Sequence, residues 1–208
     1  LYFFGIGESL LESRLKELMV SSLNPTVAPY AKTGEVMLRL TAKVRDPKEA
    51  DTVMAPAMEK IREAAGAYLY GIDVGNLQTA AVRLLKEKGL HVAMAESCTG
   101  GLVSKRITEV SGASEVFECG ICTYSNRMKQ QFLHVKEKTL QKFGAVSAET
   151  AAEMAEGIRA VSGADIGVSV TGNAGPGASE GKPVGMVFVG VSSKNYTSVI
   201  SLNIRRTD

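Results

Sequence analysis

The first residues that could carry chemistry are small and polar. The run Glu96-Ser97-Cys98-Thr99-Gly100-Gly101 lies between a short apolar stretch and a helical pattern. A serine or cysteine at such a strand-to-helix turn can act as a nucleophile, and either Ser97 or Cys98 would serve. Free backbone N–H groups at the start of the helix could stabilise an oxyanion or hold an anion. The same run would also form a tight turn that caps the helix, so both interpretations stay open.

A second candidate is the run Thr123-Tyr124-Ser125-Asn126-Arg127-Met128-Lys129. Tyr124 ends a predicted strand and Lys129 lies on the first turn of the next predicted helix, so both side chains could point into one cleft. Lysine acts as a general base only where burial or a nearby cation lowers its pKa, because the ammonium form has no lone pair. Most lysines on helices are simply solvated, and for this residue alone that alternative remains.

A third candidate is the glycine-rich run Thr171-Gly172-Asn173-Ala174-Gly175-Pro176-Gly177, followed after a polar insert by Lys182-Pro183-Val184-Gly185. Glycines allow the backbone to approach a ligand closely, and successive N–H groups can cradle a phosphate. No Gly-Lys-Ser/Thr follows, so this is not a Walker loop. An ordinary turn between two strands is the alternative.

Two further patterns resemble ligand sites. Cys119 and Cys122 have the spacing of zinc ligands, but residues three apart on a strand face opposite sides and no second ligand pair exists. We therefore predict no metal site. The pair Arg205-Arg206 could reach a phosphate or could simply be surface residues near a terminus.

The scarcity of histidine narrows the choice of general base. The chain contains two histidines, His91 in a predicted strand and His134 in a predicted helix. This disfavours a serine-histidine-aspartate triad and shifts the base role toward Lys129.

The elements that position these runs alternate between strands and helices. After a helix that ends at Gly89, strands are predicted at 91–95, 116–123 and 166–170, with helices at 101–110, up to 143 and at 148–161. A hairpin of strands 186–191 and 198–204 follows. The fold class is therefore α/β, with a layered domain and a mixed sheet over residues 73–208. Ligands gather at strand ends in such sheets, where all three candidate runs lie.

The first part of the chain, residues 1–72, reads as a small α+β domain. Its helical pattern returns five apolar residues to one face: Leu10, Leu11, Leu15, Leu18 and Met19. Val36, Leu38 and Leu40 alternate with polar residues as a half-buried strand. Asp46-Pro47 is expected to cap a second helix. No catalytic constellation is evident in this part.

Composition agrees with an ordinary globular protein. The 208 residues are 45% hydrophobic and 22% charged, with a formal net charge of +2. Apolar stretches are shorter than the roughly 20 residues that span a bilayer, and the first residues lack the features of a secretory leader. The odd count of three cysteines fits a reducing compartment. We expect a cytoplasmic protein that does not contact membranes.

Taken together and in this order, the three candidate runs, with Gly144-Ala145-Val146-Ser147 and Lys182-Pro183-Val184-Gly185, closely resemble the C-terminal domain of the CinA family. The resemblance covers residues 73 to 208. The first part, with Phe4-Gly5-Ile6-Gly7-Glu8-Ser9 and Asn24-Pro25-Thr26-Val27-Ala28-Pro29, resembles the middle, KH-like domain of the fused family members.

This resemblance implies an activity, because the family includes nicotinamide-nucleotide amidases that convert nicotinamide mononucleotide to nicotinate mononucleotide and ammonia in pyridine-nucleotide salvage. On that basis Ser97 would attack the carboxamide, Lys129 would move the proton, and Tyr124 would orient or relay it. No metal or organic cofactor is required. The N–H groups near Thr99 to Gly101 would form the oxyanion hole. The expected substrate-binding residues are Glu96, Thr99, Gly100, Gly101, Asn126, Thr171, Gly172, Ala174 and Gly175.

The resemblance also bears on the binding partners of the chain and on its alternative function. The family's habits favour a homodimer. Nucleic-acid binding is disfavoured because residues 1–72 lack the Gly-x-x-Gly loop of a KH module. The rival function is a catalytically silent nucleotide-binding or regulatory module.

Three departures from the family pattern stand out. Nothing in the sequence matches the molybdopterin-binding-like domain of fused members, so its pyrophosphatase activity is expected to be absent. The family's closing helix is not reached. Asn173 occupies a usually apolar position, which could alter the loop and weaken activity.

Overall fold

The computed structural model describes residues 1–32, 34–178 and 180–204. The chain divides into two compact units, Leu1–Ala80 and Ala81–Asp208. This division falls inside helix α3 (Leu77–Lys88), whereas the sequence analysis places the boundary at residue 73. Arg205 and Arg206, the arginines considered above as phosphate ligands, lie outside the described residues.

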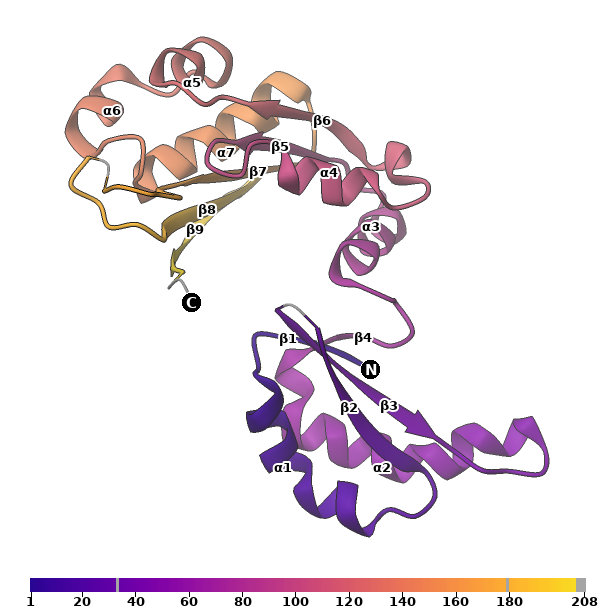
Figure 1. The fold of residues 1–208 in the computed structure, drawn as a ribbon. Coiled ribbons are helices and arrows are strands. Elements are labelled where there is room, and N and C mark those ends of the chain that lie inside the picture. The colour runs from indigo at the N-terminus through magenta and orange to yellow at the C-terminus, as the bar shows by residue number, and fades with distance from the viewer. Residues whose placement is uncertain (33, 179, 205–208) are drawn as a thin grey trace. The chain divides into compact units, whose positions relative to one another are not determined.

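In the first unit, two helices pack on a four-stranded antiparallel sheet (Figure 1). The sheet order is β2-β3-β1-β4. The elements are β1 (Tyr2–Phe4), α1 (Glu8–Ser21), β2 (Thr26–Lys32), β3 (Glu35–Thr41), a 3-10 turn η1 (Pro47–Glu49), α2 (Ala50–Ala65), a second turn η2 (Gly66–Tyr68) and β4 (Leu69–Gly71). This is the small α+β domain predicted from the sequence.

The apolar periodicity of this unit is confirmed with one exception. Leu11, Leu15 and Leu18 of α1 are buried, but Leu10 is 49% exposed, so its assignment to the buried face was wrong. The reason is geometric: Leu11, Leu15 and Leu18 already complete a stripe at spacings of four and three, and Leu10 lies about 100° away from Leu11 around the helix axis. In β3, Val36 and Leu38 are buried as predicted.

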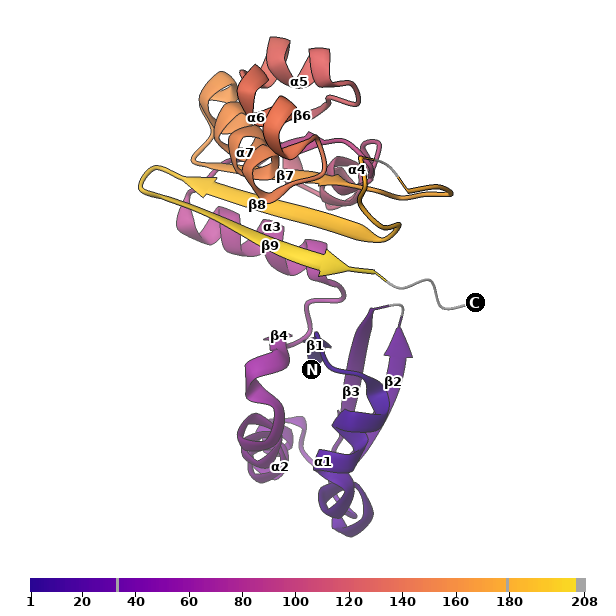
Figure 2. The ribbon, with the colours of Figure 1, turned by 90° about the vertical axis from the view of Figure 1, so that its left-hand side faces the viewer.

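The second unit is a five-stranded mixed sheet with helices on both faces (Figure 2). Its order is β6-β5-β7-β8-β9, with β5 parallel to β6 and β7 and the last pairs antiparallel. The elements after α3 are β5 (Val92–Glu96), α4 (Leu102–Thr108), a 3-10 turn η3 (Ala113–Glu115), β6 (Phe117–Cys122), α5 (Asn126–Leu133), α6 (Glu137–Phe143), α7 (Ala148–Ser162), β7 (Ile166–Gly172), β8 (Met186–Ser193) and β9 (Tyr196–Asn203). The α/β class, the mixed sheet and the closing hairpin are confirmed.

The central strand β5 is buried along its whole length, and its alternation assigns one set of side chains to each face. Ala93 and Ala95 pack in the core beneath α5, α6 and α7. Val92 and Met94 pack in the opposite core, with α3 and α4. Because the parallel strands β5, β6 and β7 run the same way, the segments that leave their carboxyl ends meet at one edge of the sheet.

No helix among the described residues is long and apolar enough to cross a membrane.

Candidate functional site

The three candidate runs meet at this edge in a cavity of about 460 Å³. That volume lies in the usual range of small-molecule sites, roughly 300 to 1,000 Å³. Eight predicted site residues line it: Ser97, Tyr124, Asn126, Lys129, Thr171, Gly172, Ala174 and Gly175. Four others, Glu96, Thr99, Gly100 and Gly101, are not among its lining residues.

The centre of the cavity is a serine-lysine pair. Lys129 Nζ lies 3.0 Å from Ser97 Oγ, 2.9 Å from the carbonyl oxygen of Thr123 and 3.1 Å from that of Tyr124. The Lys129 side chain is completely buried. A neutral amine in this position donates its two hydrogens to the two carbonyl oxygens and turns its lone pair toward the serine hydroxyl. This arrangement suits proton transfer from Ser97.

Burial lowers the pKa of Lys129, because removal from water disfavours the ammonium form. The negative charge of Glu180, and that of Cys122 or Cys98 when the thiol is ionised, opposes this shift but does not cancel it. The pKa of Lys129 is therefore shifted in the direction that a lysine base requires.

Backbone hydrogen bonds fix both partners to the sheet. The Ser97 N–H donates to the carbonyl of Val170 at 2.9 Å, and the Thr123 N–H donates to the carbonyl of Glu96 at 2.9 Å. Lys129 is held by α5, whose N-cap residue Ser125 accepts a hydrogen bond from the Met128 N–H at 3.3 Å. The pair is thus preorganised by main-chain contacts.

Tyr124 contacts Lys129 differently from the predicted relay. Its side chain is 76% exposed at the mouth of the cavity, whereas its backbone carbonyl accepts the hydrogen bond from Lys129. The contact seen in the structure requires no hydroxyl, and the relay role stays a prediction.

Glu96 contacts the residues around the start of α4, and its contact with the substrate stays a prediction. Its side chain is 1% exposed and accepts hydrogen bonds from the N–H groups of Gly101, Val103 and Ser104 and from the Ser104 hydroxyl. Burial by itself would raise the pKa of this carboxyl, but the bonds from Ser104 and its neighbours hold the pKa below its usual value. The alternation of β5 explains the contact, because Glu96 follows Val92 and Met94 on the face that α4 covers.

The N–H groups of Gly100 and Gly101, predicted as oxyanion donors, are already engaged. Gly100 N–H donates to the carbonyl of Ser97 at 3.1 Å, and Gly101 N–H donates to Glu96. Neither donor is free for a reacting oxygen in this conformation.

The glycine-rich loop is held by Asn173, which sequence analysis treated only as a departure from the family. Its side-chain amide donates to the carbonyls of Gly177 and Lys182, both at 3.1 Å, and its oxygen accepts from the Gly175 N–H at 3.1 Å. Asn173 is buried, so these bonds satisfy a polar group that burial alone would penalise. The residue shapes the loop that forms one wall of the cavity.

Thr171 and Glu180 complete that wall. The Thr171 hydroxyl donates to the carbonyl of Ala145 at 2.7 Å, and a Glu180 carboxylate oxygen accepts from the Val146 N–H at 3.2 Å. Glu180 was not among the predicted site residues, because nothing in the polar insert around it indicates that its side chain reaches back to the residues before α7.

A buried hydroxyl beside the pair provides a stability prediction. Thr123 is fully buried, and its Oγ1 has no hydrogen-bond partner among the described residues. Thr123→Val keeps the shape and removes the unsatisfied group, so we expect stability to rise by about 1 kcal/mol in urea unfolding. The matched variant Thr123→Ala also removes a methyl group and should lower stability. A Thr123→Val variant that is less stable than wild type would contradict the view that this hydroxyl is unsatisfied.

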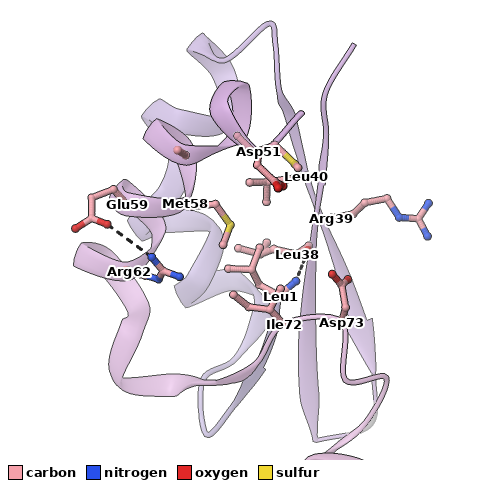
Figure 3. Close-up of a pocket in the computed structure, with 12 residues that line it drawn as sticks. Leu1, Leu38, Arg39, Leu40, Asp51, Met58, Glu59, Arg62, Ile72 and Asp73 are labelled. Atoms are coloured by element: carbon pink, nitrogen blue, oxygen red, sulfur yellow. Dashed lines mark hydrogen bonds and ion pairs between the residues drawn. The ribbon is translucent and has the colours of Figure 1, made fainter. Parts of the chain in front are cut away.

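A slightly larger cavity, of about 500 Å³, lies in the first unit (Figure 3). Figure 3 shows Leu1, Leu38 and Ile72 together, the ion pair of Glu59 and Arg62 at its margin, and Arg39 extending away. No serine, cysteine, lysine or histidine is among its described lining residues. Its titratable side chains are carboxylates and arginines, whereas the smaller cavity holds a hydroxyl paired with a buried amine, so the smaller cavity is the candidate active site.

No cluster of three or more histidine, cysteine, aspartate or glutamate side chains in the described part of the chain could hold a metal ion. Cys119 is half-buried, whereas Cys122 is exposed, as expected for residues on opposite faces of β6.

Comparison with known protein families shows to which family the chain belongs. Residues 75–208 match the model of the CinA C-terminal domain, and residues 1–71 match that of the damage-inducible protein CinA KH domain. The chain belongs to the CinA family. It is 48% identical to a CinA-like protein of Kosmotoga olearia over 97% of this chain and 49% of the relative. It is 51% identical to a putative competence-damage inducible protein of Caldicellulosiruptor saccharolyticus over 94% of this chain and 48% of the relative.

Solved CinA structures resemble part of the chain. The competence/damage inducible protein CihA from Agrobacterium tumefaciens is 40% identical, with a TM-score of 0.60 over 65% of this chain and 83% of that one. A CinA superfamily protein from Escherichia coli is 28% identical, with a TM-score of 0.62 over 66% of this chain and 83% of that one. The chain spans about half the length of the curated relatives that it matches.

Proposed function

We propose that the second unit hydrolyses the carboxamide of nicotinamide mononucleotide to nicotinate mononucleotide and ammonia, as part of pyridine-nucleotide salvage. The observation that carries this proposal is the 3.0 Å contact between Ser97 Oγ and the fully buried Lys129 Nζ. The choice of substrate rests on the resemblance to nicotinamide-nucleotide amidases, and the volume of the cavity is compatible with it.

In the proposed mechanism, Ser97 Oγ attacks the carboxamide carbon while its proton passes to the lone pair of Lys129. The resulting ammonium then protonates the departing nitrogen, the C–N bond breaks, and ammonia leaves an ester on Ser97. Water attacks this ester with Lys129 again accepting a proton. Collapse of the second tetrahedral intermediate returns the proton to Ser97 and releases the acid.

We propose that the ribose-phosphate end of the substrate lies against the loop 171–177. Ala174 and Gly175 of this loop line the cavity, and so does Asn126 at the start of α5. The Thr171 hydroxyl proton is bonded to Ala145, so Thr171 can accept from a ribose hydroxyl but is not free to donate to a phosphate.

The test compares nicotinamide mononucleotide with nicotinamide riboside, which lacks the phosphate. Anion-exchange separation should reveal nicotinate mononucleotide, which carries one more negative charge than the substrate, and far less nicotinate riboside. Hydrolysis of both substrates would contradict the proposal that the loop binds the phosphate. Hydrolysis of neither, with binding retained, would favour the catalytically silent nucleotide-binding module.

The cytoplasmic location and the homodimer stay predictions. Sedimentation of the purified chain at several concentrations and fractionation of cells would check them.

The pH dependence of the reaction should respond to Glu180. Burial is the largest influence on the pKa of Lys129 and lowers it, whereas the Glu180 charge is the strongest of the three groups that raise it, followed by Cys122 and Cys98. Because the base must be neutral, activity should rise with pH through the pKa of Lys129. Glu180→Gln removes the opposing charge, lowers that pKa further, and should move the acid limb of kcat/KM to lower pH.

The matched control is Glu156→Gln, an exposed glutamate on α7 that does not line the cavity. This variant should leave the acid limb in place. A limb that stays fixed or moves to higher pH in Glu180→Gln would contradict the electrostatic role of Glu180.

A further inference from the structure

We propose that the backbone N–H groups of Cys98 and Thr99 form the oxyanion hole, and that Glu96 is the positioning residue that fixes the turn carrying them. This inference rests on Ser97 being the nucleophile of the proposed function. It keeps Thr99 from the predicted region Thr99 to Gly101 and replaces Gly100 and Gly101, whose N–H groups are engaged, with Cys98.

The first support is the fate of each N–H group in the turn and at the start of α4. Ser97 N–H donates to Val170, and Gly100 N–H donates to Ser97. The remaining engaged groups are Leu102 N–H, which donates to Thr99, and the N–H groups of Gly101, Val103 and Ser104, which donate to Glu96. Among the described residues 97–104, this leaves only the Cys98 and Thr99 N–H groups without a carbonyl or carboxylate acceptor.

The second support is the position of these two groups in the chain. They belong to the two residues that directly follow Ser97, and Cys98 lines the cavity beside Ser97. Backbone N–H groups stabilise an oxyanion when they lie within hydrogen-bond distance of the oxygen that gains the charge, and the residues next to the nucleophile lie nearest to that oxygen.

The third support is the rigidity that Glu96 gives the turn. Its two carboxylate oxygens accept four hydrogen bonds, at 3.1 Å from Gly101 N, 3.1 Å from Val103 N, 2.8 Å from Ser104 N and 2.6 Å from Ser104 Oγ. Glu96 lies in β5 immediately before Ser97 and holds the backbone on the far side of the turn. Glu96 lies before the turn and its carboxylate binds N–H groups after the turn, so the turn is fixed at both ends. These N–H groups are therefore not available to bind the oxyanion.

The test combines kinetics with a substrate-independent probe. Glu96→Gln keeps the size of the side chain but replaces one acceptor oxygen with an NH2 group that faces donors. Loss of a well-placed oxyanion donor lowers kcat by roughly 10²- to 10³-fold, so misplacing the turn should reduce kcat by at least about tenfold with little change in KM. The rate at which a fluorophosphonate labels Ser97 should fall in parallel, because that reaction places negative oxygen at the same point.

The control is Glu109→Gln, which makes the same substitution at the residue that follows α4, where Glu109 pairs with Lys105 on the surface. It should leave kcat and the labelling rate unchanged. If the wild-type chain is labelled at Ser97 but does not hydrolyse nicotinamide mononucleotide, the substrate proposal fails and the positioning role is still tested by labelling. A Glu96→Gln variant that is folded and labelled at the wild-type rate would overturn the role of Glu96.

A second variant addresses the N–H group itself and does not depend on Glu96→Gln being folded. Incorporating lactic acid at position 99 replaces the N–H with an ester oxygen, and Thr99→Ala is the matched reference that retains the N–H. We expect labelling of Ser97 to be roughly 10²-fold slower in the ester than in Thr99→Ala. Equal labelling rates in these two proteins would overturn the assignment of the oxyanion hole.

Discussion

Ser97→Ala is expected to abolish hydrolysis of nicotinamide mononucleotide, with a loss of at least about 10³-fold in kcat, and to leave the protein folded. The expected loss is large because no other hydroxyl or thiol among the described residues lies at hydrogen-bond distance from Lys129 Nζ. The structural cost is small, since Lys129 keeps its two carbonyl acceptors. Stopped assays for ammonia, with circular dichroism on the same samples, would measure both quantities.

The matched control is Cys98→Ser, because Cys98 lines the same cavity and is the alternative nucleophile in the turn. Burial raises the pKa of the Cys98 thiol, so little thiolate is present near neutral pH. We expect Cys98→Ser to retain most of the activity. Full turnover in Ser97→Ala together with its loss in Cys98→Ser would move the nucleophile to Cys98.

Lys129→Met is expected to lower kcat by roughly 10²- to 10⁴-fold, the usual contribution of a positioned general base. Methionine has a similar length and is compatible with complete burial, so the variant should fold. Lys129→Arg should be equally inactive, because a guanidinium stays protonated and cannot accept the serine proton. Activity that survives in Lys129→Arg would show that the positive charge, and not proton transfer, is what the site requires.

The stability of Lys129→Met should differ from wild type in its dependence on pH. The folded-state pKa of Lys129 is lowered, whereas the unfolded chain titrates near 10.4, about the value of free lysine. Between these two values unfolding takes up a proton, so wild-type stability rises with pH in that window and is lost as pH falls through the folded-state pKa. In urea unfolding at several alkaline pH values, the stability of wild type relative to Lys129→Met should therefore rise with pH in this window.

Much of the fold followed from periodicity, because strands buried on both faces and amphipathic helices leave clear patterns. The first four residues of β5, 92–95, appear as an apolar run, and the closing hairpin appears as two alternating runs. The pairing of Ser97 with Lys129 could be predicted for the same reason, because both residues follow strands that are parallel neighbours in the structure.

The side-chain contacts of the loops could not be predicted from the periodicity of the sequence. Asn173 bonds to Lys182, nine positions later in the chain, and Glu180 bonds to Val146, 34 positions earlier. Such contacts depend on loop geometry, which has no period. Glu96 is different, because extending the alternation of Val92 and Met94 by one more step would have placed its side chain toward α4.

The most direct test of the serine-lysine amidase is ammonia release from nicotinamide mononucleotide by the wild-type chain and by Ser97→Ala, measured side by side at equal concentrations of folded protein. We expect steady release of ammonia, stoichiometric with nicotinate mononucleotide, from the wild-type chain and none above background from the variant. Release at equal rates from both, or from neither while the wild-type chain still binds the nucleotide, would contradict it.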